Sequence, residues 1–75
     1  METKIAVIGM MVKDLDCVPE LNSLLSEYGN SIVGRMGIPY HEKEMNIISV
    51  VIDAKPHTID SLKEKIEKID GVFLV

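Results

Sequence analysis

The sequence contains few of the residues that small domains use as covalent or metal cross-links. Its 75 residues include one cysteine, Cys17, and two histidines, His41 and His57, and no CxxC, HxxxH or HxH pair occurs. A lone cysteine excludes a disulfide within the chain and is typical of a cytoplasmic protein. We interpret the thiol and the two imidazoles as isolated surface or core groups, and we expect no metal and no cofactor.

Aromatic and basic residues are also scarce. Phe, Trp and Tyr make up 4% of the chain, and eight Lys and Arg are outnumbered by twelve Asp and Glu, which gives a net charge of -4. A chain with this charge is repelled by phosphate backbones on average. RNA-recognition domains also stack bases on aromatic residues of their central strands, and the two most apolar segments of this chain have none. We therefore expect no direct nucleic-acid partner.

No hydrophobic run is long enough to span a bilayer. The longest, Ile5–Val12, includes Gly9 and ends at Lys13 and Asp14, whereas a membrane-spanning helix needs about 20 apolar residues. The N-terminus lacks a basic segment followed by a signal-peptide core. The sequence therefore predicts no membrane partner.

The apolar pattern predicts four strands within a single domain, residues 1–75. The strands are expected at Lys4–Val12, Ile32–Ile38, Asn46–Asp53 and Val72–Val75. The first and third are apolar on both faces, as in buried central strands. The second contains two glycines and an arginine and stops at Pro39, which is typical of a sheet edge.

Two amphipathic helices are predicted between these strands. The first follows an N-cap at Asp16 and ends at Gly29 and Asn30, and the second follows an N-cap at Thr58 and ends at Gly71. Apolar residues recur along one face of each helix, at Leu21, Leu24, Leu25 and Tyr28 in the first and at Ile59, Leu62, Ile66 and Ile69 in the second.

The resulting βαββαβ order predicts an α+β, ferredoxin-like sandwich. Right-handed crossovers place both helices on one face of a four-stranded antiparallel sheet, with Lys4–Val12 and Asn46–Asp53 in the centre. Because two helices cover only one face, one set of apolar side chains on these central strands faces outward. An uncovered apolar face on a small chain favours self-association, so we expect a homo-oligomer, either a dimer or a tetramer.

The residue pattern contains no complete catalytic set, and we expect no enzyme. Gly34 to Gly37 has the GxxG spacing of a KH loop, but it lies within a predicted strand instead of between two helices. Arg35, Tyr40 and His41 form the most suggestive cluster, since a cation and an aromatic residue at a glycine-rich edge could hold a small anion or a partner chain. The alternative is interface packing of Tyr40, with Arg35 capping a neighbouring carboxylate.

The stretch IVGRMGIPY at Ile32–Tyr40, followed by IISVVID, carries a resemblance to a known family. With KIAVIGMMV and SEYGN, it makes the chain similar to the putative iron-only hydrogenase system regulator family. This resemblance implies a small ACT-like domain that forms oligomers and has a regulatory or ligand-sensing role. The family brings no established catalytic residues. The matching motif would place a shared ligand- or partner-binding site at Gly34, Arg35, Gly37, Pro39 and Tyr40.

Two functions remain open at this stage. The first is an oligomeric regulatory module that senses a small-molecule effector. The second is a protein-protein adaptor without a small-molecule ligand, in which the edge strand Ile32–Ile38 pairs with a strand of a regulator protein. Direct DNA regulation is disfavoured because the chain lacks the separate helix-turn-helix domain that ACT-like regulators use.

Overall fold

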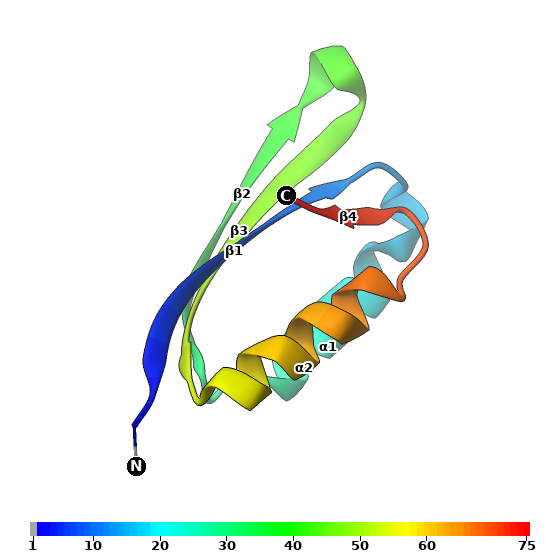
Figure 1. Ribbon diagram of the computed structural model, residues 1–75. Coiled ribbons are helices and arrows are strands. Elements are labelled where there is room, and N and C mark those ends of the chain that lie inside the picture. The colour runs from blue at the N-terminus through cyan, green and yellow to red at the C-terminus, as the bar shows by residue number, and fades with distance from the viewer. Residues whose placement is uncertain (1) are drawn as a thin grey trace.

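A computed structural model describes residues 2–75 as one four-stranded sheet with two α-helices (Figure 1). The elements in chain order are β1 (Lys4–Val12), the short 3-10 helix η1 (Leu15–Cys17), α1 (Val18–Glu27), β2 (Ile32–Tyr40), the 3-10 helix η2 (His41–Lys43), β3 (Met45–Ala54), α2 (Pro56–Glu67) and β4 (Val72–Leu74).

The sheet has the strand order β2-β3-β1-β4, and all neighbouring strands are antiparallel. Both helices lie on the same side of it, as Figure 1 shows. This arrangement confirms the predicted ferredoxin-like fold, with β1 and β3 in the centre and β2 at an edge. The β1–β3 ladder runs without interruption from the pair Lys4 and Ala54 to the pair Val12 and Asn46.

The core lies between the sheet and the two helices. Strand side chains alternate between faces, so every second residue of β1 and β3 points toward the helices. Its largest fully buried side chains are Met10, Val12, Leu21, Val50, Ile52, Ile59, Leu62 and Ile66. They come from both central strands and both helices, and in residues 2–75 no charged or polar side chain is buried with them.

The edge strand is longer than the sequence pattern predicts. We expected it to stop at Ile38, but β2 continues through Pro39 to Tyr40, and these residues pair with Asn46 and Met45 of β3. The proline is tolerated because an edge strand uses only one of its sides for pairing and can spare an amide. A bulge between Ile32 and Gly34 interrupts the register at the start of the strand.

The predicted caps of both helices are wrong by a few residues. The N-cap of α1 is Cys17, which makes no side-chain capping bond. Asp14 caps the preceding η1 instead, where its Oδ1 accepts a hydrogen bond of 3.0 Å from the Asp16 amide. The second helix begins at Pro56 instead of after Thr58, because the fixed φ of a proline suits the first helical position.

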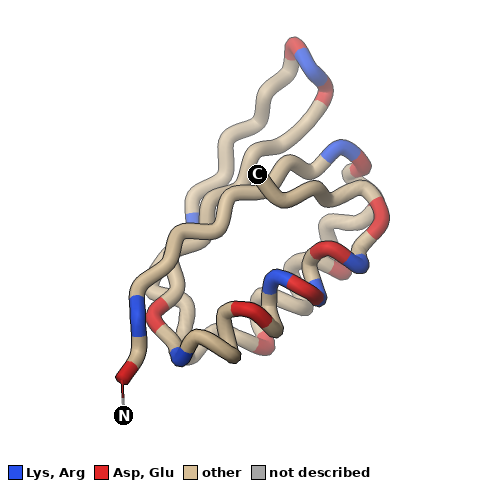
Figure 2. Tube along the Cα trace, in the orientation of Figure 1, with Lys and Arg blue, Asp and Glu red and all other residues tan. Residues whose placement is uncertain are grey.

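One face of the sheet is left without a covering layer. We call it the open face and define it by the side chains that alternate with the core set. Its apolar side chains are Ile5, Val7 and Met11 of β1, Met36, Ile38 and Tyr40 of β2, Met45, Ile47 and Val51 of β3, and Phe73 of β4, and the polar side chains of Ser49 and Asp53 lie on the same face. Charged residues gather on the helices, the turns and the hairpin tip, while the strands carry very few (Figure 2).

Candidate functional site

A cleft opens on the helix side of the sheet, where the start of α1 faces the second half of β2. We call it the α1–β2 cleft. It has a volume of about 300 Å³ and is lined by Val18, Asn22, Arg35, Gly37, Ile38, Pro39, Asn46 and Ile48. Four apolar residues and one glycine make up most of this lining, and the remaining residues are two neutral amides and a single cation. No acidic side chain lines it.

Arg35 is held at this cleft by a contact with the first helix. Its Nη2 donates a hydrogen bond of 3.1 Å to Oδ1 of Asn22. Two residues further along β2, Gly37 lies on the same face because strand side chains alternate. Arg35 therefore contacts an amide oxygen of α1 within the chain.

The structure brings together three of the five site residues named from the sequence. Arg35, Gly37 and Pro39 line the α1–β2 cleft. Gly34 pairs with Val51 and lies toward the open face, and Tyr40 pairs with Met45 on that same face. Odd spacing along a strand separates side chains onto opposite faces, which is why these two do not join the cleft.

Tyr40 and His41 line a second cleft near the tip of the β2–β3 hairpin. It has a volume of about 280 Å³, and Leu15, Glu44, Met45 and Asn46 complete its lining. The Arg35, Tyr40 and His41 cluster suggested by the sequence is thus divided between two clefts.

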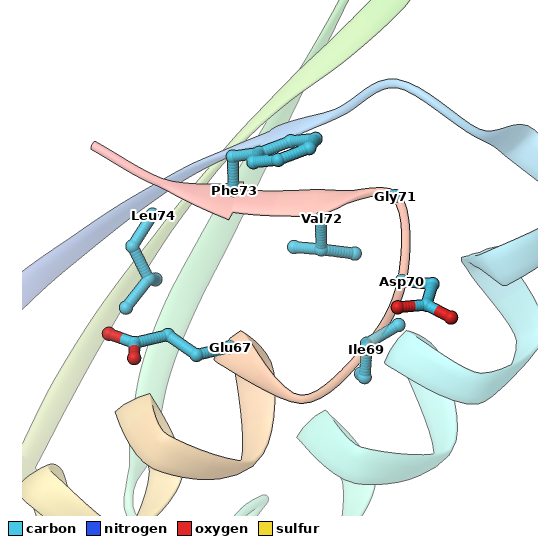
Figure 3. Close-up of a pocket in the computed structure, with 7 residues that line it drawn as sticks. All are labelled: Glu67, Ile69, Asp70, Gly71, Val72, Phe73 and Leu74. Atoms are coloured by element: carbon cyan, nitrogen blue, oxygen red, sulfur yellow. The ribbon is translucent and has the colours of Figure 1, made fainter.

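A third and larger cleft lies between the end of α2 and β4, a place that the sequence reasoning did not single out. Its volume is about 430 Å³, and Glu67, Ile69 and the segment 70–74 line it. Figure 3 shows Val72 and Leu74 pointing toward the helix side, while Phe73 points to the other side of the strand. The cleft follows the unpaired edge of a three-residue strand. The sequence feature that could have pointed to this cleft is Gly71, which we interpreted only as the end of the second helix.

Few titratable groups are perturbed in the structure. Burial, followed by the charge of Asp14, raises the pKa of the Cys17 thiol, whose Sγ donates a hydrogen bond of 2.8 Å to the Asp14 carbonyl. A hydrogen bond with Ser61 lowers the pKa of Tyr28, with Lys65 adding to the effect. None of these groups lines the α1–β2 cleft. Residues 2–75 contain no cluster of three or more His, Cys, Asp or Glu arranged to hold a metal ion.

Comparisons with known proteins place this geometry in a family. A family described as "TM1266-like: Iron-only hydrogenase system regulator, putative" matches residues 4–74. The chain belongs to this family. The assignment covers both clefts beside β2 and the whole open face.

A solved structure agrees with the family assignment. The chain is similar to the uncharacterized protein TM1266 from Thermotoga maritima, with 28% sequence identity and a TM-score of 0.91. The match covers 99% of this chain and 94% of the other. No curated protein matches the chain. The family description is that of a regulator and not of an enzyme. Within residues 2–75, neither helix combines the length and hydrophobicity needed to cross a membrane.

Proposed function

We propose that this chain is a non-catalytic, cytoplasmic regulatory module that works as a homo-oligomer and binds a small-molecule effector or a regulator protein. The observation that carries the proposal is the uncovered open face. Ile5 and Val7, at the centre of the sheet, are 70% and 66% exposed, and Met36 on the neighbouring edge strand is 62% exposed. The regulatory role follows the description of the family.

The occupant of the open face is a second copy of the chain. Three strands of nine or ten residues and the three-residue β4, spaced about 4.8 Å apart, span on the order of 500 Å² in projection, before the side chains roughen the surface. This is comparable to the roughly 800 Å² of accessible surface that each partner contributes to a standard interface. This face is mostly apolar, and its charged strand residue, Asp53, lies near the end of β3, so a symmetric pairing can bury the apolar centre while this carboxylate stays at the rim.

Self-association also supplies what a chain of this length lacks. A domain of about 60–75 residues buries only about 60% of its unfolded surface, and its stability is marginal without disulfides, metals or partners. The single cysteine excludes an internal disulfide. Burial of the open face contributes at roughly 25 cal/mol per Å² of apolar surface, so association stabilises the domain itself.

Light scattering tests the proposal. The wild-type chain at micromolar concentration should have a mass that is a multiple of 8.4 kDa, and Val7→Lys on the open face should reduce it to one chain. Leu15→Lys is the matched control, because Leu15 is an exposed apolar residue, 59% exposed, outside the open face. It should leave the mass unchanged. A wild-type mass of one chain refutes the proposal.

A second function is favoured by the edge strand. β2 is nine residues long, every residue after Ile32 is exposed, and its outer side is unpaired within residues 2–75. Such an edge accepts a strand from another protein, which is the adaptor function. Of two adjacent residues in a strand, only one points its amide toward β3. Proline removes the backbone amide, so whichever of Met36→Pro and Gly37→Pro keeps the fold has lost an amide that points away from β3. That variant should lose binding of a partner strand at the β2 edge. Unchanged binding of the partner strand contradicts the adaptor function.

A further inference from the structure

The α1–β2 cleft exists because a glycine occupies the helix-facing position of β2 opposite Ile48. Gly37 pairs with Ile48, a core residue that is 6% exposed. A Cβ built at Gly37 meets no other atom within 4 Å. The backbone conformation does not require this glycine, because its φ is not positive. The missing side chain therefore leaves a space between β2 and Val18 of α1 that a ligand can fill.

The only charge in this lining is the guanidinium of Arg35. It presents five N–H donors, and the hydrogen bond to Asn22 uses one of them while it fixes the side chain against α1. Arg35 is also the only charged residue of β2, and no carboxylate lines the cleft to neutralise it. Asn46, on the opposite wall, adds a neutral amide that can donate or accept.

The chemistry of the lining specifies the ligand. One arginine with free donors matches a single carboxylate, which guanidinium binds with two parallel hydrogen bonds. The apolar surface of Val18 and Ile48 and the open space at Gly37 match a small hydrocarbon group. A volume of about 300 Å³ lies at the lower limit of small-molecule pockets, which run from about 300 to 1,000 Å³.

We propose that the α1–β2 cleft binds a small organic monocarboxylate with an apolar body. The carboxylate lies on Arg35, and the apolar body lies over Gly37 against Ile48 and Val18. This inference rests on the proposed regulatory function, for which it names the class of effector. The cleft is on the helix side of the sheet, so pairing of two open faces leaves it accessible.

An NMR titration tests the proposal. Isovalerate and benzoate are added to the ¹⁵N-labelled wild-type chain, with isovaleramide and benzamide as uncharged matches of the same shape. The acids should shift the amide signals of residues 35–39 and of the first turn of α1, and the amides should not. Equal shifts with acid and amide, or no shift with either acid at tens of millimolar, would overturn the proposal. Inorganic phosphate that competes as well as benzoate would also overturn it, because the apolar body would then contribute nothing.

Four variants locate the site. Arg35→Gln removes the charge and should weaken binding of the acids at least about tenfold, as expected for a charge-assisted hydrogen bond. Gly37→Val fills the space and should abolish binding. If the valine side chain prevents folding, Gly37→Ala takes its place and should weaken binding. Gly34→Ala, on the opposite face of the same strand and also in open space, is the control and should bind like wild type. Unchanged binding by Arg35→Gln refutes the assignment.

The same samples separate this inference from the proposed function. The oligomer mass is measured by light scattering on each of them. An oligomer that binds neither acid overturns the ligand assignment and leaves the self-associating module intact. A single chain that binds the acids at the α1–β2 cleft overturns the oligomeric module and leaves the ligand site intact.

Discussion

Gly71 offers the sharpest test of the structure, because replacing it by alanine has two separate costs. Its φ of +91° lies in the left-handed region that side chains rarely adopt. A Cβ at this position would lie 2.6 Å from the Cβ of Asp14 and 3.4 Å from its amide nitrogen. Asp14 is not free to withdraw, since its carboxylate caps η1 and its carbonyl accepts a hydrogen bond of 3.1 Å from the Cys17 amide.

The two costs set the expected magnitude. The left-handed backbone costs a non-glycine residue about 1–2 kcal/mol, and forcing an extra methyl into a filled site costs about 1–3 kcal/mol. Gly71→Ala should therefore lower the free energy of unfolding by about 2–5 kcal/mol. Small domains are stable by only about 5–15 kcal/mol, so this single methyl group would remove a large part of the stability.

Urea denaturation followed by far-ultraviolet circular dichroism measures this change, at one fixed protein concentration because the chain is proposed to associate. Gly34→Ala is the matched control, since its added Cβ lies in open space and its φ is not positive. Alanine there should leave stability unchanged or raise it by up to about 1 kcal/mol. If Gly71→Ala lies within about 0.5 kcal/mol of Gly34→Ala, the packing of the α2–β4 turn on Asp14 is wrong.

Three further predictions concern the core and the helix layer. Leu62→Ala should lower the free energy of unfolding by about 2–5 kcal/mol in urea, because Leu62 is fully buried, whereas Lys63→Ala on the exposed side should change it by less than about 0.5 kcal/mol. The Cys17 thiol should react slowly with a thiol reagent when folded and rapidly in urea. Equal reaction rates in the folded and unfolded states would contradict the burial of the thiol. Because the raised pKa means that the folded state holds the thiol proton more tightly, the free energy of unfolding should fall as the pH rises above the usual thiol range. Tyr28→Phe removes a 3.1 Å hydrogen bond between Oη and the Ser61 Oγ and should cost about 0.5–1.5 kcal/mol, with a non-additive effect in combination with Ser61→Ala.

The fold could be predicted because local pattern and topology agree along most of the chain. The continuous apolar run at Lys4–Val12 predicted β1 with the same bounds, and the strand pairs with β3 along its whole length. The two helical faces containing Leu21 and Ile59 were also placed correctly in the core. Errors occurred where two local signals compete, as at Pro39, which can end a strand or occupy its edge.

The site was harder to predict, because its members depend on which face of β2 each residue occupies. Glycines within a strand are typical of a bulge, and the structure has one between Ile32 and Gly34. The motif gives no indication of the contact between Arg35 and Asn22, which lies 13 residues away in sequence. The separation of Arg35 and Tyr40 onto opposite faces could have been predicted, because their spacing along the strand is odd. The residues of α1 that line the cleft could not be predicted, because they depend on how the helix packs on the sheet.

Of the three surfaces inferred for this chain, the open face lies on the opposite side of the sheet from the α1–β2 cleft, whereas the cleft and the edge strand overlap in β2. Pairing of open faces uses side chains such as Val7, strand addition uses the backbone of β2, and the α1–β2 cleft lies on the helix side. Self-association therefore does not compete with either of the other two. Strand addition and ligand binding do share β2, since the residues from Arg35 to Pro39 form both the edge strand and one wall of the cleft. A ligand held on Arg35 would stabilise one conformation of that strand, so effector and partner strand would be coupled through β2, in either direction and by the same factor.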